Sequence, residues 1–248
     1  MNMVVMDTIT DIETALMPGS DDAHLLRLMA WLSPSFPVGA FSYSHGLEYA
    51  VEAGRVIDRE TLLAWSSEIL QRGSGRVDAA LFRASHDAVL TEDTDLIGWA
   101  LERGDTMRAT RELGVEAEGQ GRAFLAAVSG PWPAPGLDWL QARATALARP
   151  VVYPVAVGVA AAAHQIPLSL ALAAYLHAFA ANLVSAGLRL VPLGQSDGQQ
   201  AISELEPIIQ HAVTAALQRP YTDIGSSTLL VDWASANHET QYTRLFRS

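Results

Sequence analysis

Histidines and carboxylates are the residues of this chain that could do chemistry, because it contains no cysteine and no lysine. Seven histidines stand at positions 24, 45, 86, 164, 177, 211 and 238. No two of them are two, three or four residues apart, so no helix presents two imidazoles on one face as a zinc site would need. A hydrogen-bonded core histidine is the simpler interpretation. The metal-ligand candidates that remain are His45, His164 and His177, with a nickel or zinc site between subunits as an open alternative.

The other short motifs do not complete a catalytic site. His238 and Glu239 begin like a zinc-protease helix, but Tyr242 stands where the second histidine belongs. Ser44 and His45 are adjacent without the glycines of a nucleophile elbow. The paired acids and the Gly-x-Gly stretches lack the rest of any metal-loop or nucleotide-binding motif. We assign no catalytic residue and no stably bound cofactor.

The composition excludes further classes of function. All 16 basic residues are arginine, and 27 acidic residues give a net charge of −11. Without lysine there is no Schiff-base nucleophile, and without cysteine there is no disulfide framework, iron–sulfur site or thiolate zinc site. A strongly acidic surface repels nucleic acid and anionic lipid, so we expect neither as a partner. A reducing compartment suits such a chain and we expect a cytoplasmic protein, although other compartments are compatible with it.

The elements that position these residues are predicted to be helices. Apolar residues recur at helical spacing after Asp21 or Asp22, either of which could cap the first helix, and after Asp58, which opens another. Similar stripes recur over 113–128, 137–147 and 202–213. Pro207 is expected in the first turn of a helix, because a proline in the interior costs about 3 kcal/mol. The prediction is an all-α, single-domain helical bundle of about ten helices with a buried apolar central helix.

An uncharged run of 39 residues, from Pro150 to Leu188, raises the question of a membrane span. Segment 151–163 is too short to cross a bilayer. Segment 168–190 is long enough, but it is mostly alanine and leucine and carries His177, Asn182 and Ser185. Its flanks also lack the Lys/Arg asymmetry that orients membrane spans. We therefore expect a core helix or a subunit interface. An integral membrane protein stays as an alternative, which predicts that the purified chain needs detergent.

Three polar segments remain, and for the first of them a structural turn is the simplest interpretation. The first, residues 37–48, joins a rigid turn to a helix that Ser42 or Ser44 could cap. The second, residues 191–200, follows the apolar helix. The third, residues 237–248, ends with Leu245 and Phe246 between two arginines. A frayed end gains nothing from an exposed phenylalanine, so this third segment is predicted to be a docking arm.

These segments together resemble the urease accessory protein UreF family. PVGAFSYSHGLE at 37–48 is similar to the family's N-terminal signature, and the stretch from Glu112 to Gly121 is similar to its middle segment. LHAFAANLVSAGLRLVPLGQSDGQ at 176–199 resembles its most recognisable stretch, and HETQYTRLFRS at 238–248 its C-terminus. The resemblance covers residues 24 to 248 with the motifs in the same order.

The resemblance implies an all-α, non-enzymatic scaffold. Such proteins bind the accessory protein UreD (also called UreH), often as a dimer of heterodimers. Together they recruit the GTPase UreG and help load nickel into apo-urease. A role in coupling UreG's GTP hydrolysis to metal delivery is also implied. The nickel is then handled by the complex, and a homodimer within that complex is expected. A lysine contact to the GTPase would have to be replaced by arginine here, and the two are not equivalent.

The organisation that follows has three parts: a flexible leader at 1–20, an all-helical domain at 21–236 and a C-terminal docking tail at 237–248. Arg244 would help order the C-terminus once UreD is bound, and the region from Tyr43 to Glu48 would lie near the dimer or GTPase-facing surface. The alternative function is a helical metal- or ligand-binding enzyme that uses His45, His164 or His177. The partner-binding candidates are Tyr43, His45, Glu48, Gln195, Asp197, Gln199, Tyr242, Arg244, Leu245, Phe246 and Arg247.

Overall fold

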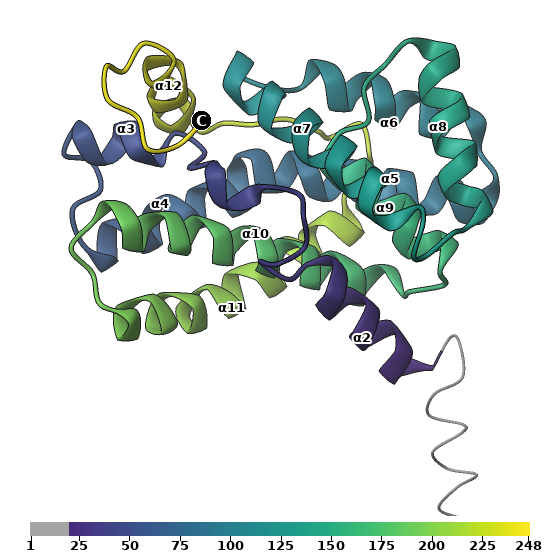
Figure 1. Ribbon diagram of the computed structural model, residues 1–248, viewed down its shortest axis with the longest axis horizontal. Coiled ribbons are helices and arrows are strands. Elements are labelled where there is room, and N and C mark those ends of the chain that lie inside the picture. The colour runs from purple at the N-terminus through teal and green to yellow at the C-terminus, as the bar shows by residue number, and fades with distance from the viewer. Residues whose placement is uncertain (1–19) are drawn as a thin grey trace, which may run out of the picture.

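The computed structural model describes residues 20–248, which fold into helices without a strand (Figure 1). The predicted all-α, single-domain class is confirmed. The predicted leader lies almost entirely outside the described residues. In chain order the elements are α2 (Asp21–Trp31), the 3-10 turn η1 (Ala40–Ser42), α3 (Leu47–Glu52), α4 (Arg59–Arg72), α5 (Ser74–Thr91), α6 (Thr94–Thr106), α7 (Arg111–Val128), α8 (Pro135–Leu147), α9 (Tyr153–Ala163), α10 (Leu168–Leu190), α11 (Gln195–Gln218) and α12 (Leu229–His238).

The most deeply buried helix is α9, which supplies the centre of the bundle. Its residues from Pro154 to Ala162 are all buried, and it packs along α5 and against α7, α8 and α10. A Cβ on Gly158 would collide with the Ser85 side chain and the Phe82 carbonyl of α5. The glycine therefore lets the two backbones approach closely. The short apolar segment that could not span a membrane is thus the central helix.

Helix α10 buries one side and leaves the other uncovered. Its length and composition pass the test for a membrane span, but Leu172, Leu176 and Leu183 pack into the protein interior. It lies beside α11, with which it forms a helical hairpin in Figure 1. Leu170 and His177 are exposed on its other side. Helix α10 is therefore a half-buried helix of the bundle, with an uncharged face left open.

Helix starts follow local hydrogen-bonding chemistry. Asp58 caps α4 as predicted, in a reciprocal capping box with Thr61. The cap of α2 is Ser20, whose hydroxyl accepts the Ala23 N–H, so the prediction of Asp21 or Asp22 was off by one or two positions. Both aspartates lie instead in the first turn, where they favourably face the positive end of the helix dipole.

The expected position of Pro207 was wrong, because it lies inside the 24-residue helix α11. Pro207 and Ser203 are exposed, so water can reach the Ser203 carbonyl that the missing N–H leaves without its helical partner. Leu205 and Ile209 are buried on either side of the proline. Their packing holds the helix continuous across it.

Two groups of buried apolar residues make up the interior. The larger contains α9 with parts of α5, α7, α8 and α11. The smaller, which we call the second core cluster, joins Leu47 of α3, Leu62 of α4, Leu183 of α10 and Val231 of α12. It also includes Phe246, which follows α12 near the C-terminus. The smaller cluster is thus built from both ends of the described chain.

Candidate partner-binding site

The C-terminal segment folds back onto the protein rather than projecting as a free arm. Helix α12 ends at His238, so the first two residues assigned to the tail are helical. The chain then turns and runs between α12, α3 and α7, where Figure 1 marks the C-terminus. Phe246 and Ser248 are buried. The ring of Phe246, one of the partner-binding candidates, packs in the second core cluster.

Glu48 holds the backbone of this tail. Its two carboxylate oxygens accept the N–H groups of Leu245 at 2.6 Å and of Phe246 at 2.9 Å. Glu48 is buried in the first turn of α3. The helix can come close to α12 because Gly46, at φ +77°, precedes it, and a Cβ there would lie 2.9 Å from the Ser235 nitrogen. A predicted partner-binding residue thus binds the protein's own tail.

His238 links Glu48 to a second carboxylate. The imidazole has no exposed surface, its Nε2 lies 3.0 Å from Glu48 Oε2, and its Nδ1 lies 2.7 Å from Glu112 Oε2. The other Glu112 oxygen accepts from the Arg244 guanidinium at 2.9 Å. Each ring nitrogen of His238 therefore contacts one carboxylate, Glu48 on α3 and Glu112 on α7. We call Glu48, Glu112, His238 and Arg244 the tail clamp.

A third carboxylate and two serines fix the end of the tail. The Ser248 carbonyl accepts the Ser44 N–H at 2.8 Å and the Ser44 hydroxyl. The Ser248 hydroxyl donates to Glu116 Oε2 at 2.7 Å. His45 Nδ1 lies 3.4 Å from the same Glu116 oxygen, and its Nε2 lies 2.8 Å from the Ser74 hydroxyl. Ser44 therefore binds the tail, and its hydroxyl also accepts the Glu48 N–H in the first turn of α3 at 3.3 Å, as a capping residue does, although the N-cap position itself is Gly46.

The Phe246 ring is covered by an arginine. The Arg189 guanidinium carbon lies 4.3 Å from the ring centroid, and the same guanidinium donates to the Phe41 carbonyl at 2.8 Å. Partial burial lowers the pKa of Arg189. The last basic residue of α10 thus connects the tail to the segment before α3 through a cation–π contact.

The outer side of the tail and of α12 is exposed and apolar. Tyr242 is fully exposed, at 103%, and Leu245 is 65% exposed. On α12, Leu229 is 81% exposed, and Leu230 and Trp233 are also exposed. A concentration of uncovered large apolar side chains is typical of a protein–protein interface. We call these five residues the tail surface.

The remaining sequence-predicted residues fall into two groups. Tyr43 is buried, with its hydroxyl close to Gly119 of α7, whereas Arg247 is exposed and donates its N–H to the Ser42 carbonyl at 2.8 Å. Gln195, Asp197 and Gln199 begin α11, far from α12 in Figure 1. Asp197 accepts the Gly194 N–H at 2.9 Å and so caps its own helix.

The structure does not bring the three metal-ligand candidates together. His164 faces the Trp132 carbonyl at 3.2 Å, and its pKa is lowered chiefly by burial. His45 is held by Ser74 and Glu116, and His177 is exposed on α10. Over residues 20–248, no group of three or more histidines and carboxylates has an arrangement that could hold a metal ion.

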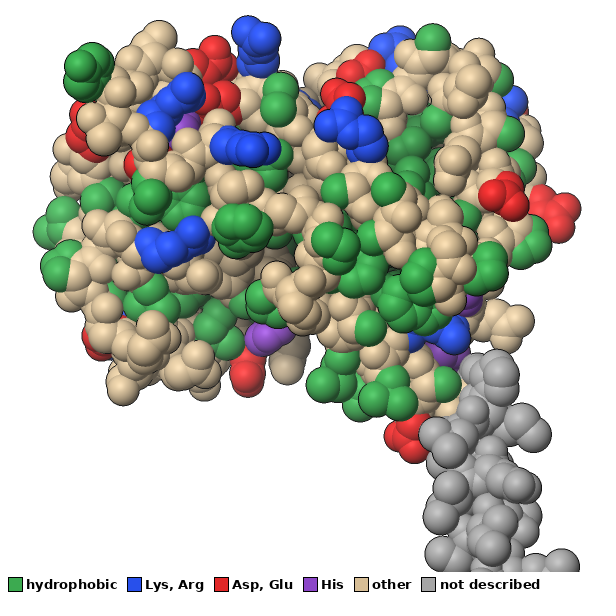
Figure 2. Space-filling model, in the orientation of Figure 1, with side chains coloured by type: hydrophobic (Ala, Val, Ile, Leu, Met, Phe, Trp, Pro, Cys, Tyr) green, Lys and Arg blue, Asp and Glu red, His purple; other side chains and the backbone are tan. Residues whose placement is uncertain are grey.

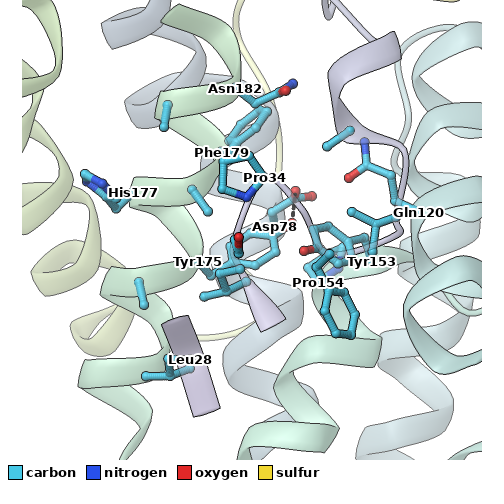
Figure 3. A pocket seen from close by; sticks show the side chains of 18 of the residues that line it. Leu28, Pro34, Asp78, Gln120, Tyr153, Pro154, Tyr175, His177, Phe179 and Asn182 are labelled. Carbon is cyan, nitrogen blue, oxygen red and sulfur yellow. Dashed lines mark hydrogen bonds between the residues drawn. The ribbon is translucent and has the colours of Figure 1, made fainter. Parts of the chain in front are cut away.

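A cavity of about 620 Å³ lies next to the tail clamp, between α2, the segment after it, α7 and α10. Leu25, Met29 and Phe41 are exposed along it. Figure 3 shows His177 pointing away from Asp78 and Tyr175, which meet at its inner end. There the Tyr175 hydroxyl donates to Asp78 at 2.7 Å, and Arg108 pairs with Asp78 at 2.8 Å.

The charges of this inner cluster compensate one another. Burial, followed by the Asp78 charge, raises the pKa of Tyr175 well above its ordinary value. The phenol therefore stays protonated and donates to Asp78, while Arg108 neutralises that carboxylate. Such an arrangement holds α5, α10 and the segment before α7 together. It offers no nucleophile paired with a base.

Sequence reasoning missed the residues that make the site. Glu112, Glu116, His238 and Ser248 were not candidates, although Glu112 and His238 begin two of the family-like stretches. Pairing between them depends on contacts more than 120 residues apart in the chain. The spacing of residues within one segment cannot predict such contacts.

An all-helical protein with a buried polar clamp on its own tail, and with exposed apolar residues beside that clamp, has the features of a protein-binding module. The UreF family model matches residues 56–206. The chain is 47% identical to the urease accessory protein UreF of Bradyrhizobium sp. strain BTAi1 over 235 residues, which cover 95% of this chain and 96% of the relative. The chain belongs to the UreF family of urease accessory proteins.

Other relatives agree with this assignment. Urease accessory protein UreF of Bradyrhizobium diazoefficiens is 45% identical over 246 residues, which cover 99% of this chain and 100% of the relative. The Magnetococcus marinus protein of the same name is 43% identical over 233 residues, which cover 92% and 100%. The resemblance stated from the sequence motifs is therefore confirmed.

Proposed function

We propose that this chain is a non-catalytic scaffold that binds UreD (UreH) and the GTPase UreG in the cytoplasm and helps assemble the nickel centre of apo-urease. The observation that carries the proposal is the clamped tail. Three carboxylates, the buried Glu48 and Glu116 and the partly buried Glu112, all bind residues 244–248. Carboxylates that fix the backbone of an exposed segment in one conformation favour a role in which that segment binds a partner.

We place the UreD contact on the tail surface. Tyr242, Leu245 and Trp233 are exposed side chains held on ordered backbone. A preordered surface loses little conformational entropy on binding, so its apolar contacts contribute more fully to affinity. Arg247, exposed beside Leu245, supplies a polar contact at the rim. The buried residues Tyr43, His45 and Glu48 then act on binding through the tail position rather than by contact.

We place a homodimer contact on the open side of α10 and on α2. Leu25, Met29 and Phe41 are exposed beside the cavity, and α10 carries no charged side chain before Arg189. Figure 2 shows hydrophobic side chains on α2 and scattered over the surface next to it. Two copies of a chain with net charge −11 repel each other over most of their surface. An uncharged apolar face allows them to meet without that repulsion.

UreG binding and nickel transfer complete the proposal. Gln195 and Gln199 are exposed at the start of α11 and are candidates for the GTPase contact, through which the scaffold affects GTP hydrolysis. Nickel is cargo of the complex and no cofactor stays on this chain. Saturable one-to-one nickel binding by the isolated protein, lost in His45→Ala or His177→Ala, would contradict this part and favour the metal-binding alternative.

Co-purification with UreD and UreG tests the scaffold proposal. Tagged UreD should retain this chain, and light scattering should then show a two-to-two complex. Leu245→Ala and Tyr242→Ala together should weaken UreD binding at least about tenfold, because both side chains are exposed and their removal leaves the core intact. Leu90→Ala, an exposed leucine on α5, is the matched control and should bind normally. Unchanged affinity of the double variant would remove the tail surface from the proposal.

A further inference from the structure

A second cavity, of about 360 Å³, lies where α4 ends, α5 begins and α11 ends. Its inner lining is small and apolar, with Leu70 and several alanines. Its charged lining comes from three arginines, one histidine and one aspartate. These are Arg72, Arg76, Arg219, His211 and Asp223. None of them belongs to the tail clamp or the tail surface.

The charge of this lining is opposite to that of the protein. The chain has 16 basic and 27 acidic residues, yet three guanidinium groups face this cavity and Asp223 is its one carboxylate. Glu68 pairs with Arg72, but at 3.3 Å between exposed side chains, where a salt bridge contributes little. The cavity therefore has a local excess of positive charge.

These arginines are not needed to cap the helices that end here. The last carbonyls of α11 are taken by a different residue, Arg83, which donates to the Ala216 carbonyl at 2.9 Å and to the Arg219 carbonyl at 2.8 Å. The Arg72 carbonyl at the end of α4 accepts the Ser227 N–H at 2.9 Å. These three carbonyls are satisfied without the side chains of Arg72 and Arg219.

The donors of the lining are more numerous than the acceptors that reach them. Arg76 Nη2 donates to the Asp223 carboxylate at 2.6 Å and to the Asp223 carbonyl at 3.2 Å, whereas the Arg76 Nε is buried without a partner. Arg219 Nε reaches the other Asp223 oxygen only at 3.8 Å. One half-exposed carboxylate is therefore shared between two guanidinium groups, which normally each favour a bidentate partner.

We propose that this cavity is a binding site for a small oxyanion, with Arg76 and Arg219 as its principal ligands and Arg72 at its rim. Phosphate and carboxylate share the required chemistry, since both present planar or tetrahedral oxygens to guanidinium donors. Asp223 occupies part of the site in the unbound protein, so the anion binds in competition with this internal carboxylate. The site is independent of the scaffold function proposed above.

Isothermal titration with sodium phosphate tests the site, with sodium acetate as a second arm and sodium chloride at equal ionic strength as the reference. Arg76→Gln combined with Arg219→Gln should weaken phosphate binding at least about tenfold. Asp223→Asn should strengthen it, because the competing charge is gone while the side chain keeps its shape. Arg55→Gln, which removes an exposed arginine from the turn after α3, should leave it unchanged. Acetate binding as tight as phosphate would assign the site to carboxylates.

Two outcomes would overturn the proposal. In the first, neither phosphate nor acetate gives saturable binding heat, in the wild type or in Asp223→Asn. The other is an equal loss in Arg55→Gln and in the Arg76/Arg219 variant, which would mean a general charge effect. Circular dichroism of each variant checks that α11 and the segment after it remain folded, and thermal unfolding without anion separates lost binding from lost stability.

Discussion

Glu48 and His238, which are 190 residues apart in the chain, meet 3.0 Å apart in the interior. This contact joins α3 to the end of α12, and the same Glu48 carboxylate then receives two backbone N–H groups of the tail. A buried charge that accepts three hydrogen bonds is well compensated, but the loss of one partner leaves the others unsatisfied. The tail conformation therefore depends strongly on this one side chain.

Glu48→Ala is expected to release the tail. It leaves two backbone N–H groups and His238 without their acceptor, which should lower the free energy of unfolding by roughly 3 kcal/mol. Trypsin should then cleave faster after Arg244, a bond that is easily assigned in a chain without lysine. Urea unfolding and mass spectrometry of the digest measure the two effects. Glu68→Ala removes an exposed glutamate of α4 and should change stability by less than about 0.5 kcal/mol. Equal cleavage in both variants would contradict the clamp.

His238 and Glu112 should be energetically coupled. Because the imidazole is fully buried and 2.7 Å from the carboxylate, a double-mutant cycle with His238→Ala and Glu112→Ala should give a coupling free energy of at least about 1 kcal/mol. The exposed pair Arg122 and Glu118, 3.6 Å apart on one face of α7, provides the comparison and should give less than about 0.5 kcal/mol. Additive single-variant effects at His238 and Glu112 would show that they do not act together.

Gly46→Ala is expected to be more damaging than Gly54→Ala, although both glycines have positive φ. At Gly54 nothing lies within 4 Å of an added Cβ, so only the backbone strain of about 1 kcal/mol applies. At Gly46 the Cβ would also press on the Ser235 backbone, and overpacking adds about 1–3 kcal/mol. Thermal or urea unfolding compares the two. A Gly46 variant as stable as the Gly54 variant would show that α12 can move away from α3 without cost.

Stability should fall at mildly acidic pH through His164. Burial first, and then the Arg27 charge, lower the pKa of His164, while its hydrogen bond to the Trp132 carbonyl raises it. The folded protein thus favours the neutral ring. Its contribution is present above the unfolded pKa of 6.5 and is lost as the pH falls through the lower folded pKa. His164→Gln should flatten this part of the curve of melting temperature against pH. An unchanged slope in His164→Gln would contradict this assignment.

The helices could be predicted because their signals are local. Asp58 and Thr61 are three residues apart, and both halves of their capping box are visible in the sequence. Pro207 failed for a non-local reason, because the buried neighbours Leu205 and Ile209 outweigh the intrinsic penalty of the proline. Local preference sets where a helix can start, whereas tertiary packing decides whether it continues.

The site could be predicted only as a set of segments. The sequence motifs singled out the segments that contain Tyr43, Glu48 and Arg244, but the residues that join those segments lie on α7 and at the end of α12. His238 was examined for its partner four residues later, while its actual partners are Glu48 and Glu112. Carboxylates on different helices become neighbours only through the fold. Their pairing therefore requires coordinates.

The second core cluster has a consequence for the order in which the chain folds during synthesis. Its members come from α3, α4, α10, α12 and residue 246, so its last component emerges when translation of these 248 residues is almost finished. The larger interior, by contrast, is complete in sequence by α11. Folding during synthesis should first produce an intermediate in which Leu47, Leu62 and Leu183 are not yet covered by Phe246. Until Phe246 leaves the ribosome, that intermediate exposes the apolar surface of the second core cluster. The nascent chain is then a candidate for binding by a chaperone.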